Sequence, residues 1–483
     1  MPKKKQVEPG WLPFLLPHEW LSEYLQQPGA KEEAMPETGS YKSQKLAEMC
    51  EAWGNPAGSM VPLGLHGDGV PIQGRMNQST LDVWCLNLPC SEKFQAERVP
   101  IGCLEPKYNA GPETCKAICE VIAWSLKKLG EGHFPCERHD GKSFDSLKDK
   151  KRKGMAGEAM PAKATLIEMR SDWDWNMKWY GAPAPNQTTG CCWLCAAKPG
   201  TWKALSIQER KDISLTKAEW FESLASRKKA PNPIFHLPGV TNWTILPDWM
   251  HVADEGCGAL AAGQILWEVL SCYDHSNQEG RVALLWEHIT KIYEASSWPG
   301  DKKITKLTLK DIKKPGKAAE LDVKAAECRH FIPILEILTR ENGLHTGTKR
   351  QLAIHNAAKY CGRYLALETG NLANLASNGY KFISQYMALE QHAVSKDEDD
   401  THTWRVRPKF HLLQHILDQA CEGCHPKDIW NYRDETCAYT WQQLWFRRGG
   451  NPAGPGNDSE KVLLRWSNDT KFWSLQKAVT SSL

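Results

Sequence analysis

Two pairs of soft metal ligands stand far apart in the sequence. Cys192 and Cys195 form a C-x-x-C turn, whereas His411 and His415 are four residues apart, which places both imidazoles on one side of a helix. Two thiolates and two imidazoles complete a tetrahedral zinc shell, so the residue types predict a structural Zn²⁺ site if the fold brings the two pairs together. The alternative is a set of buried free cysteines and hydrogen-bonded histidines.

Other donors compete for the same ion. Cys421, Cys424 and His425 form a second C-x-x-C group, and His251 is the next candidate if the histidine pair lies elsewhere. The chain has 17 cysteines, and its basic start at Met1 is followed by no apolar segment of the secretory kind. We therefore expect a reducing compartment, where clustered thiols ligate metals more often than they form disulfides.

Three carboxylates stand where the chain is expected to change direction. Asp68 lies between two glycines at the end of an apolar run, which gives a metal or phosphate room to approach the backbone. Asp172 directly follows another apolar run, and Glu435 lies at the start of an expected helix. Purely structural interpretations remain open as well: Asp68 as a turn residue, Asp172 as a helix N-cap, and Glu435 as a solvated helix residue. The neighbouring Asp174 and Asp434 are alternative donors.

Strands and helices must position these residues. Three runs rich in β-branched and aromatic residues, with turn residues between them, predict an antiparallel meander. The runs are 61–69, 81–88 and 99–104. A helix is expected from Pro112 to Gly130, because apolar residues recur there at three- and four-residue steps. The segment 164–169 predicts a fourth strand and 244–247 a weak fifth.

The second half of the chain has a different pattern. From 255 to about 395 apolar residues recur at helical spacing, and an acidic connector follows at 395–400. Strands, a long helical block and a closing helix in this order predict an α/β architecture with a helical insertion.

Composition limits the class of protein. Hydrophobic residues make up 41% and charged residues 24%, which excludes a wholly disordered chain. No apolar run approaches the roughly 18 residues of a membrane span, so no membrane partner is expected. The net charge is only +3, so nucleic-acid binding must depend on a local patch. One basic segment can supply it: Lys148, Lys150, Lys151, Arg152 and Lys153.

Taken together, the motifs resemble those of eukaryotic cut-and-paste DNA transposases. The likeness is greatest to dinoflagellate transposase-like proteins, with the CACTA-like and Kyakuja-Dileera-Zisupton-like superfamilies as broader kin. The motifs are the string from Val61 through Gly67-Asp68-Gly69, the tryptophan-flanked Asp172, the C-x-x-C of Cys192 and Cys195, and the D-x-x-H of Asp248 and His251. The spacing of the cysteines and histidines also resembles the zinc-bearing V(D)J recombinase catalytic subunit.

The resemblance implies an RNase H-like core of mixed sheet and flanking helices, interrupted by a large all-helical insertion. It also implies an Asp-Asp-Glu triad of Asp68, Asp172 and Glu435 that holds catalytic Mg²⁺ or Mn²⁺. Two such ions, about 3.5–4 Å apart, activate the attacking group and stabilise the leaving oxygen in phosphodiester chemistry. Asp68 would contact both ions, and each of the other two carboxylates would contact one.

The implied organisation has five parts. They are an N-terminal extension (1–60), the first part of the core with the C-x-x-C turn (61–254), the helical insertion (255–405), the second part with the zinc-ligand and catalytic helices (406–450), and a C-terminal tail (451–483). About 60 residues precede Asp68, which leaves little room there for a separate DNA-binding domain.

Two functions of different classes follow. The first is a nuclear transposase that cleaves and transfers DNA strands, with transposon ends and target DNA as partners and a homo-oligomer as a possible assembly. The second is a catalytically inactive, zinc-stabilised scaffold derived from such an enzyme, which binds DNA or protein. Intact carboxylates at all three positions favour the first, and the short N-terminal segment favours the second. An unrelated zinc-binding protein is a weaker third interpretation.

Overall fold

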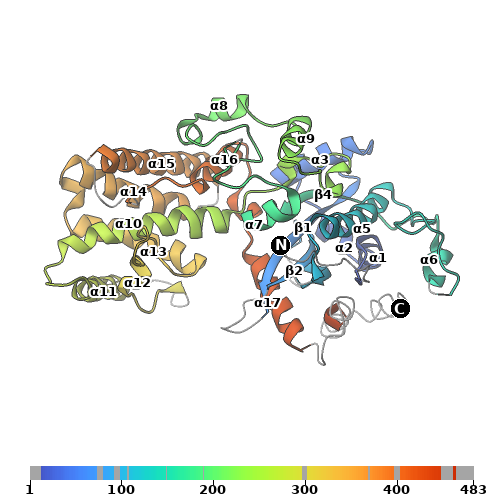
Figure 1. Ribbon diagram of the computed structural model, residues 1–483, viewed down its shortest axis with the longest axis horizontal. Coiled ribbons are helices and arrows are strands. Elements are labelled where there is room, and N and C mark those ends of the chain that lie inside the picture. Colours follow the sequence, from blue (N-terminus) through green and yellow to red (C-terminus); the bar gives the residue numbers. More distant parts are fainter. Residues whose placement is uncertain are drawn as a thin grey trace, which may run out of the picture.

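A four-stranded mixed sheet and a large block of helices make up the protein (Figure 1). The computed structural model describes residues 12–72, 80–91, 98–105, 108–147, 149–188, 190–295, 302–367, 370–395, 403–447 and 461–463. Most of the predicted tail, 451–483, lies outside these residues. The architecture is mixed α/β, as the sequence predicts.

The sheet has the strand order β3-β2-β1-β4. Its strands are β1 (Met60–Pro71), β2 (Thr80–Asn87), β3 (Arg98–Leu104) and β4 (Lys163–Arg170). The strands β1, β2 and β3 form an antiparallel meander, and β4 pairs in parallel with β1. All four predicted strands are therefore present, with bounds shifted by a few residues.

The predicted fifth strand at 244–247 is wrong. Ile245 makes one isolated parallel bridge with Met169, and the Leu246 amide donates to the Met169 carbonyl at 3.0 Å. A 3-10 turn ends at Thr244 and Pro247 lacks an amide hydrogen, so the ladder cannot be extended in either direction. The segment still lies along the edge of β4 that β1 leaves free.

Four described helices that precede residue 132 pack on the sheet or on one another. They are α1 (Pro17–Tyr24), α2 (Ala30–Ala34), α3 (Tyr41–Ala52) and α5 (Pro112–Glu131). Both α5 and α3 contact β4, and α1 packs on α5, so the described part of the predicted N-terminal extension belongs to the core. The predicted helix from Pro112 is confirmed. It ends at Glu131 rather than Gly130, because Gly132 takes the left-handed conformation (φ 78°).

The left half of Figure 1 is helical. Its helices are α10 (Ala259–Val269), α11 (Gln278–Ala295), α12 (Leu309–Ile312), α13 (Ala325–Glu341), α14 (Lys349–Leu365) and α15 (Leu372–Ser395). They follow a π-helical segment, η6 (Met250–Gly258), and α13, α14 and α15 pack on one another in sequence. None of the described helices is long and apolar enough to span a bilayer.

The remaining helices connect the two halves. Short ones surround the C-x-x-C turn: α7 (Trp173–Trp175), η2 (Asn176–Tyr180), η3 (Trp202–Ala204), α8 (Ile207–Asp212) and α9 (Lys217–Ser226). Others close the chain: α16 (Lys409–Cys421), η10 (Pro426–Ile429) and α17 (Tyr432–Arg447). The basic helix α6 (Lys150–Met155) lies at the far right of Figure 1.

Tryptophans pack against β1 where its glycines leave space. An ideal Cβ on Gly67 would lie 2.1 Å from the ring of Trp175, which stacks on Trp179 at 5.1 Å. Any side chain at Gly67 must therefore displace a rigid, buried ring.

We predict that Gly67→Ala destabilises the fold by about 1–3 kcal/mol, the usual cost of overpacking. The matched control is Gly69→Ala, where an added Cβ meets nothing closer than Thr80 at 3.9 Å. Urea unfolding of both variants measures the difference. Equal stability of the two would contradict the packing argument.

Candidate functional site

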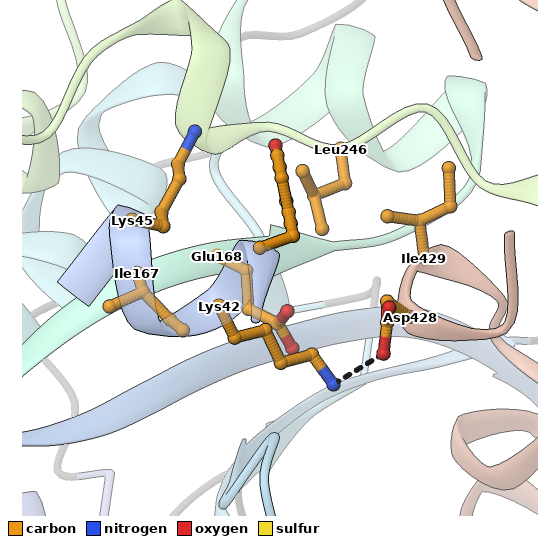
Figure 2. Close-up of a pocket in the computed structure, with 8 residues that line it drawn as sticks. Lys42, Lys45, Ile167, Glu168, Leu246, Asp428 and Ile429 are labelled. Atoms are coloured by element: carbon orange, nitrogen blue, oxygen red, sulfur yellow. Dashed lines mark ion pairs between the residues drawn. The ribbon is translucent and has the colours of Figure 1, made fainter. Parts of the chain in front are cut away.

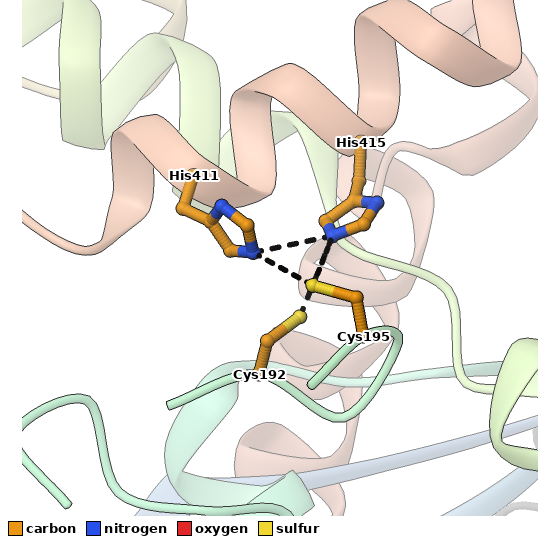
Figure 3. Close-up of side chains that lie close together, drawn as sticks. All are labelled: Cys192, Cys195, His411 and His415. Carbon is orange, nitrogen blue, oxygen red and sulfur yellow. Dashed lines mark hydrogen bonds between the residues drawn. The ribbon is translucent and has the colours of Figure 1, made fainter. Parts of the chain in front are cut away.

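The two predicted pairs of zinc ligands meet in the interior (Figure 3). Cys192, Cys195, His411 and His415 are all buried, and their ligand atoms lie within 4.8 Å of one another. The Cys195 Sγ lies 3.2 Å from the His411 Nε2 and 3.3 Å from the His415 Nε2. The predicted convergence of these four residues is therefore confirmed.

The spacing of the donor atoms suits zinc. A tetrahedral ion with bonds of about 2.0–2.3 Å keeps its ligand atoms roughly 3.3–3.8 Å apart. The His411 and His415 Nε2 atoms are 3.2 Å apart, and the Cys192 Sγ is 3.6 Å from the His415 Nε2. Two sulfur and two nitrogen donors with no exposed face form a closed site of the structural type.

Of the two cluster thiols only Cys195 favours the thiolate, because burial and the neighbouring Cys195 raise the pKa of Cys192. A hydrogen bond from Cys192 and further ones from both imidazoles lower the pKa of Cys195 and outweigh burial, so the thiolate is favoured. Burial lowers the pKa of His415, so its neutral form is favoured. A thiolate and a neutral imidazole are the forms that ligate zinc.

Each half of the cluster is held by its own contacts. The turn is fixed where the Trp193 indole donates to the Ile245 carbonyl at 3.1 Å, beside β4. The helix α16 is fixed by Arg210, whose Nε and Nη2 each donate to an Asp418 carboxylate oxygen at 2.7 Å. Trp202 and Trp243 lie edge-on to the two imidazoles.

The rival donor set does not gather. Cys421 is exposed whereas Cys424 is buried, and neither belongs to the one Cys/His/carboxylate group at metal-ligand spacing that the described residues contain. Cys424 lies three residues beyond the end of α16, and burial raises its pKa.

Asp68 and Asp172 lie at one edge of the sheet. The parallel pairing of β1 with β4 ends where His66 aligns with Arg170, and each aspartate follows two residues later. Asp68 still lies within β1, opposite Val83 of β2, whereas Asp172 lies beyond the end of β4. Asp172 caps α7, since its Oδ1 accepts from the Trp175 amide at 2.6 Å. Burial, and then the charge of Asp68, raise the pKa of Asp172, so the two carboxylates are close enough to repel each other. The neighbouring Asp174 is exposed.

Glu435, rather than Asp434, faces Asp68. Burial and then the charge of Asp68 raise the pKa of Glu435 to about 8. Asp434 is fully buried on another side of α17, where its Oδ1 lies 2.6 Å from the Arg98 Nε. Successive residues on a helix point about 100° apart, so only one of the pair can reach the edge.

The D-x-x-H motif connects this edge to the helical block. Asp248 accepts from the ring and the amide of His251, and its Oδ1 also accepts from the Asn431 amide at 3.0 Å. The His251 Nε2 lies 3.9 Å from a carboxylate oxygen of Glu435 and of Glu255. Burial alone would lower the pKa of His251, but Asp248 and both glutamates raise it to about 9.

The acidic edge is looser than the zinc cluster. Asp68, Asp172 and Glu435 are all described, yet their oxygens do not form a group at metal-ligand spacing. The edge therefore gathers negative charge without a preformed cation cage.

The predicted DNA-binding segment lies far from this edge. Arg152 is engaged by Glu19 and Asp149, with its Nε 2.6 Å from the Glu19 Oε1. Lys150, Lys151 and Lys153 are exposed on α6, and Lys148 lies outside the described residues. In Figure 1, α6 and the helical block are at opposite ends of the molecule.

The sequence reasoning missed Arg170. This buried arginine donates to the carbonyls of Trp430 (3.2 Å) and Asp428 (2.9 Å), so it ties the end of β4 to the segment before α17. Two charged residues, Glu168 and Arg170, at the end of a largely apolar run and just before Asp172 were the available signal.

A small pocket lies beside the same segment (Figure 2). It is lined by Tyr41, Lys42, Lys45, Ile167, Glu168, Leu246, Asp428 and Ile429. The Lys42 Nζ lies 3.0 Å from the Asp428 Oδ1 and donates to the Pro89 carbonyl at 2.7 Å. The pair attaches η10 to α3.

Asp254, on η6, links the helical block to α17. It is fully buried, accepts from the Tyr432 hydroxyl at 2.7 Å, and lies 3.9 Å from the Arg329 Nη1. The Arg329 guanidinium also covers the Trp430 and Tyr432 rings.

Comparison with known proteins identifies no family. A scan against protein-family models gives no match, and a search of the curated proteins gives none either.

We predict that the purified chain carries about one zinc ion, and that Cys195→Ser removes it and lowers the thermal midpoint of unfolding. Loss of one ligand opens the shell, and the binding free energy no longer contributes to folding. The matched control is Cys191→Ser, because Cys191 is buried next to the turn but bonds the Ala197 carbonyl at 3.5 Å. Elemental analysis and thermal unfolding measure both. Full zinc content in Cys195→Ser would exclude the site.

We further predict that Asp254 makes the fold less stable as pH rises. Burial raises its pKa to about 7, against an ordinary value of 3.8, even though Arg329 and the Tyr432 hydroxyl lower it. Folding therefore favours the protonated form, and this contribution to stability is lost between about pH 4 and 7. Thermal midpoints of the wild type should fall relative to those of Asp254→Asn over that range. The exposed Asp274→Asn should follow the wild type.

Proposed function

We propose that the chain is a metal-dependent DNA strand-cleaving and strand-transferring enzyme of the Asp-Asp-Glu class, with an RNase H-like core. The observation that supports this most is the convergence at one edge. Asp68 and Asp172 each lie two residues past the end of the parallel β1–β4 pairing, and the charge of Asp68 acts on both Asp172 and Glu435 of α17.

The topology supports the proposal. An antiparallel meander, a fourth strand parallel to the first, and a further segment along the free edge of β4 are what an RNase H-like core requires. The helices α10 to α15 lie between that segment and Glu435, where the expected insertion belongs.

The residues fit a pair of divalent cations in charge and donor type. The raised pKa values of Asp172 and Glu435 reflect burial and the negative charge of Asp68, which bound Mg²⁺ or Mn²⁺ would offset. Such ions supply activation of the attacking group and stabilisation of the leaving oxygen. Asp68 would contact both ions, Asp172 and Glu435 one each, and Asp248 orients His251 beside Glu435.

In this proposal zinc has a structural role. The cluster fixes α16 against the C-x-x-C turn, and α16 precedes the segment that carries Glu435. DNA would be the partner, with the exposed lysines of α6 as a second contact away from the acidic edge, and the nucleus the compartment. A homo-oligomer would allow two DNA ends to be held together.

One observation favours the second candidate, a catalytically inactive scaffold. The four Cys and His donor atoms are gathered at metal-ligand spacing, whereas the oxygens of the three carboxylates are not. A scaffold needs gathered zinc ligands to stabilise its fold, but it does not need gathered carboxylates.

We predict that the purified chain nicks supercoiled DNA in Mg²⁺ or Mn²⁺ and that Asp172→Asn lowers the rate on the order of 100-fold or more, because a metal ligand is lost. The matched control is Asp174→Asn, two residues away and exposed, which should keep the wild-type rate within about twofold. Zinc content should be unchanged in both. Equal nicking by Asp172→Asn and the wild type would reject the triad, and absence of metal-dependent nicking would favour the scaffold.

A further inference from the structure

Arg170 uses its whole guanidinium inside the protein. Its side chain is only 6% exposed. The Nε lies 2.6 Å from the Glu168 Oε1, the Nη2 donates to the Asp428 carbonyl at 2.9 Å, and the Nη1 donates to the Trp430 carbonyl at 3.2 Å. The Nη1 also lies 3.5 Å from the Asp434 Oδ2. The two Nη atoms therefore donate hydrogen bonds, whereas Nε lies against a carboxylate oxygen without a hydrogen bond.

Three of these four partners belong to one segment. Asp428, Trp430 and Asp434 span the end of η10 and the first turn of α17, and Glu435 is the next residue. On its other side, Arg170 ends β4 and precedes Asp172 by two residues. One side chain thus connects the backbone that carries the second carboxylate to the backbone that carries the third.

The surroundings make this connection stiff. Arg98 and Arg170 face Asp434, and Arg170 also faces Glu168, so two positive and two negative charges balance in the interior. The four side chains are at most 6% exposed. Charge pairs in such a setting interact strongly, and a planar guanidinium holds its acceptors in fixed directions, which an ammonium cannot do.

We propose that Arg170 is a positioning residue that sets the spacing between Asp172 and Glu435, and thereby the capacity of the acidic edge to bind divalent cations. The inference rests on the proposed function, which requires those two carboxylates to share a metal site.

Other contacts keep the segment folded without setting this spacing. The Asn431 amide is bound by Asp248, and Asp428 pairs with Lys42 of α3. Neither Asp248 nor Lys42 belongs to β4, the strand that leads into Asp172. Arg170→Lys keeps the positive charge but loses the two Nη donors of the guanidinium. We therefore expect it to fold with the segment 428–434 in place but held less firmly relative to the end of β4.

The experiment compares Arg170→Lys with a matched control, Arg350→Lys. Arg350 forms a two-pronged ion pair with Glu268 between α14 and α10, inside the helical block. Mn²⁺ binding is titrated by electron paramagnetic resonance, and nicking is measured against Mg²⁺ concentration. Zinc content and thermal unfolding are measured on the same samples.

We expect Arg170→Lys to weaken Mn²⁺ binding about tenfold or more, the range seen when an outer-shell partner is lost. Saturating Mg²⁺ should restore much of the nicking rate, because the ligands themselves remain. Arg350→Lys should bind Mn²⁺ within about twofold of the wild type. If Arg170→Lys does not fold, the double variant Glu168→Gln with Arg170→Gln removes the buried pair together and is titrated in its place.

Two results would overturn the inference. Unchanged Mn²⁺ binding in Arg170→Lys, beside a wild type that binds Mn²⁺ and nicks DNA, would leave the proposed function standing and reject the positioning role. A wild type that neither binds Mn²⁺ nor nicks DNA would reject both.

Discussion

The meeting of Cys192 and Cys195 with His411 and His415 is the constraint on which the rest of the protein depends. It brings together residues 216 to 223 positions apart in the chain, and their two thiols and two imidazoles suit a bridging metal ion. A second tie to α16 comes from α8, through Arg210 and Asp418. Because α16 leads into η10 and α17, the position of Glu435 depends on the Cys/His cluster, although the cluster itself contains no carboxylate.

The acidic edge is built on charge that the protein itself balances only in part. Asp434 has two arginines to neutralise it, whereas Glu435, one residue later, faces Asp68 and a single histidine. Two adjacent carboxylates therefore have opposite pKa shifts: neighbouring arginines lower that of Asp434 despite burial, and burial raises that of Glu435. Asp434 stabilises the fold through its arginines, whereas Glu435 is not neutralised by an arginine and is placed to bind a cation.

The sequence alone was sufficient to predict the four strands and the four candidate zinc ligands. It was insufficient to show which of two adjacent carboxylates, Asp434 or Glu435, faces Asp68. The strands β1 to β4 could be predicted because runs of β-branched and aromatic residues are separated by turn residues. The cysteines could be matched to the histidines because together they supply the four donors of a zinc shell. The choice between Asp434 and Glu435 depends on Arg98 and Arg170, which are distant in the chain. The run at 244–247 looked like a strand, but Pro247 and the preceding turn reduce it to one bridge. RNase H-like identity and cation binding stay predictions.

The separation of the two halves of the zinc cluster also has a consequence in time. Ribosomes extend a chain at about 5–20 residues per second, so the thiols of the C-x-x-C turn wait roughly 10–45 s for the histidines of α16. During that interval the meander and β4 are already complete, and Asp68 and Asp172 can take their places. A metal ion can therefore meet all four candidate ligands only after synthesis has passed His415, and the nascent chain must keep its thiols reduced until then.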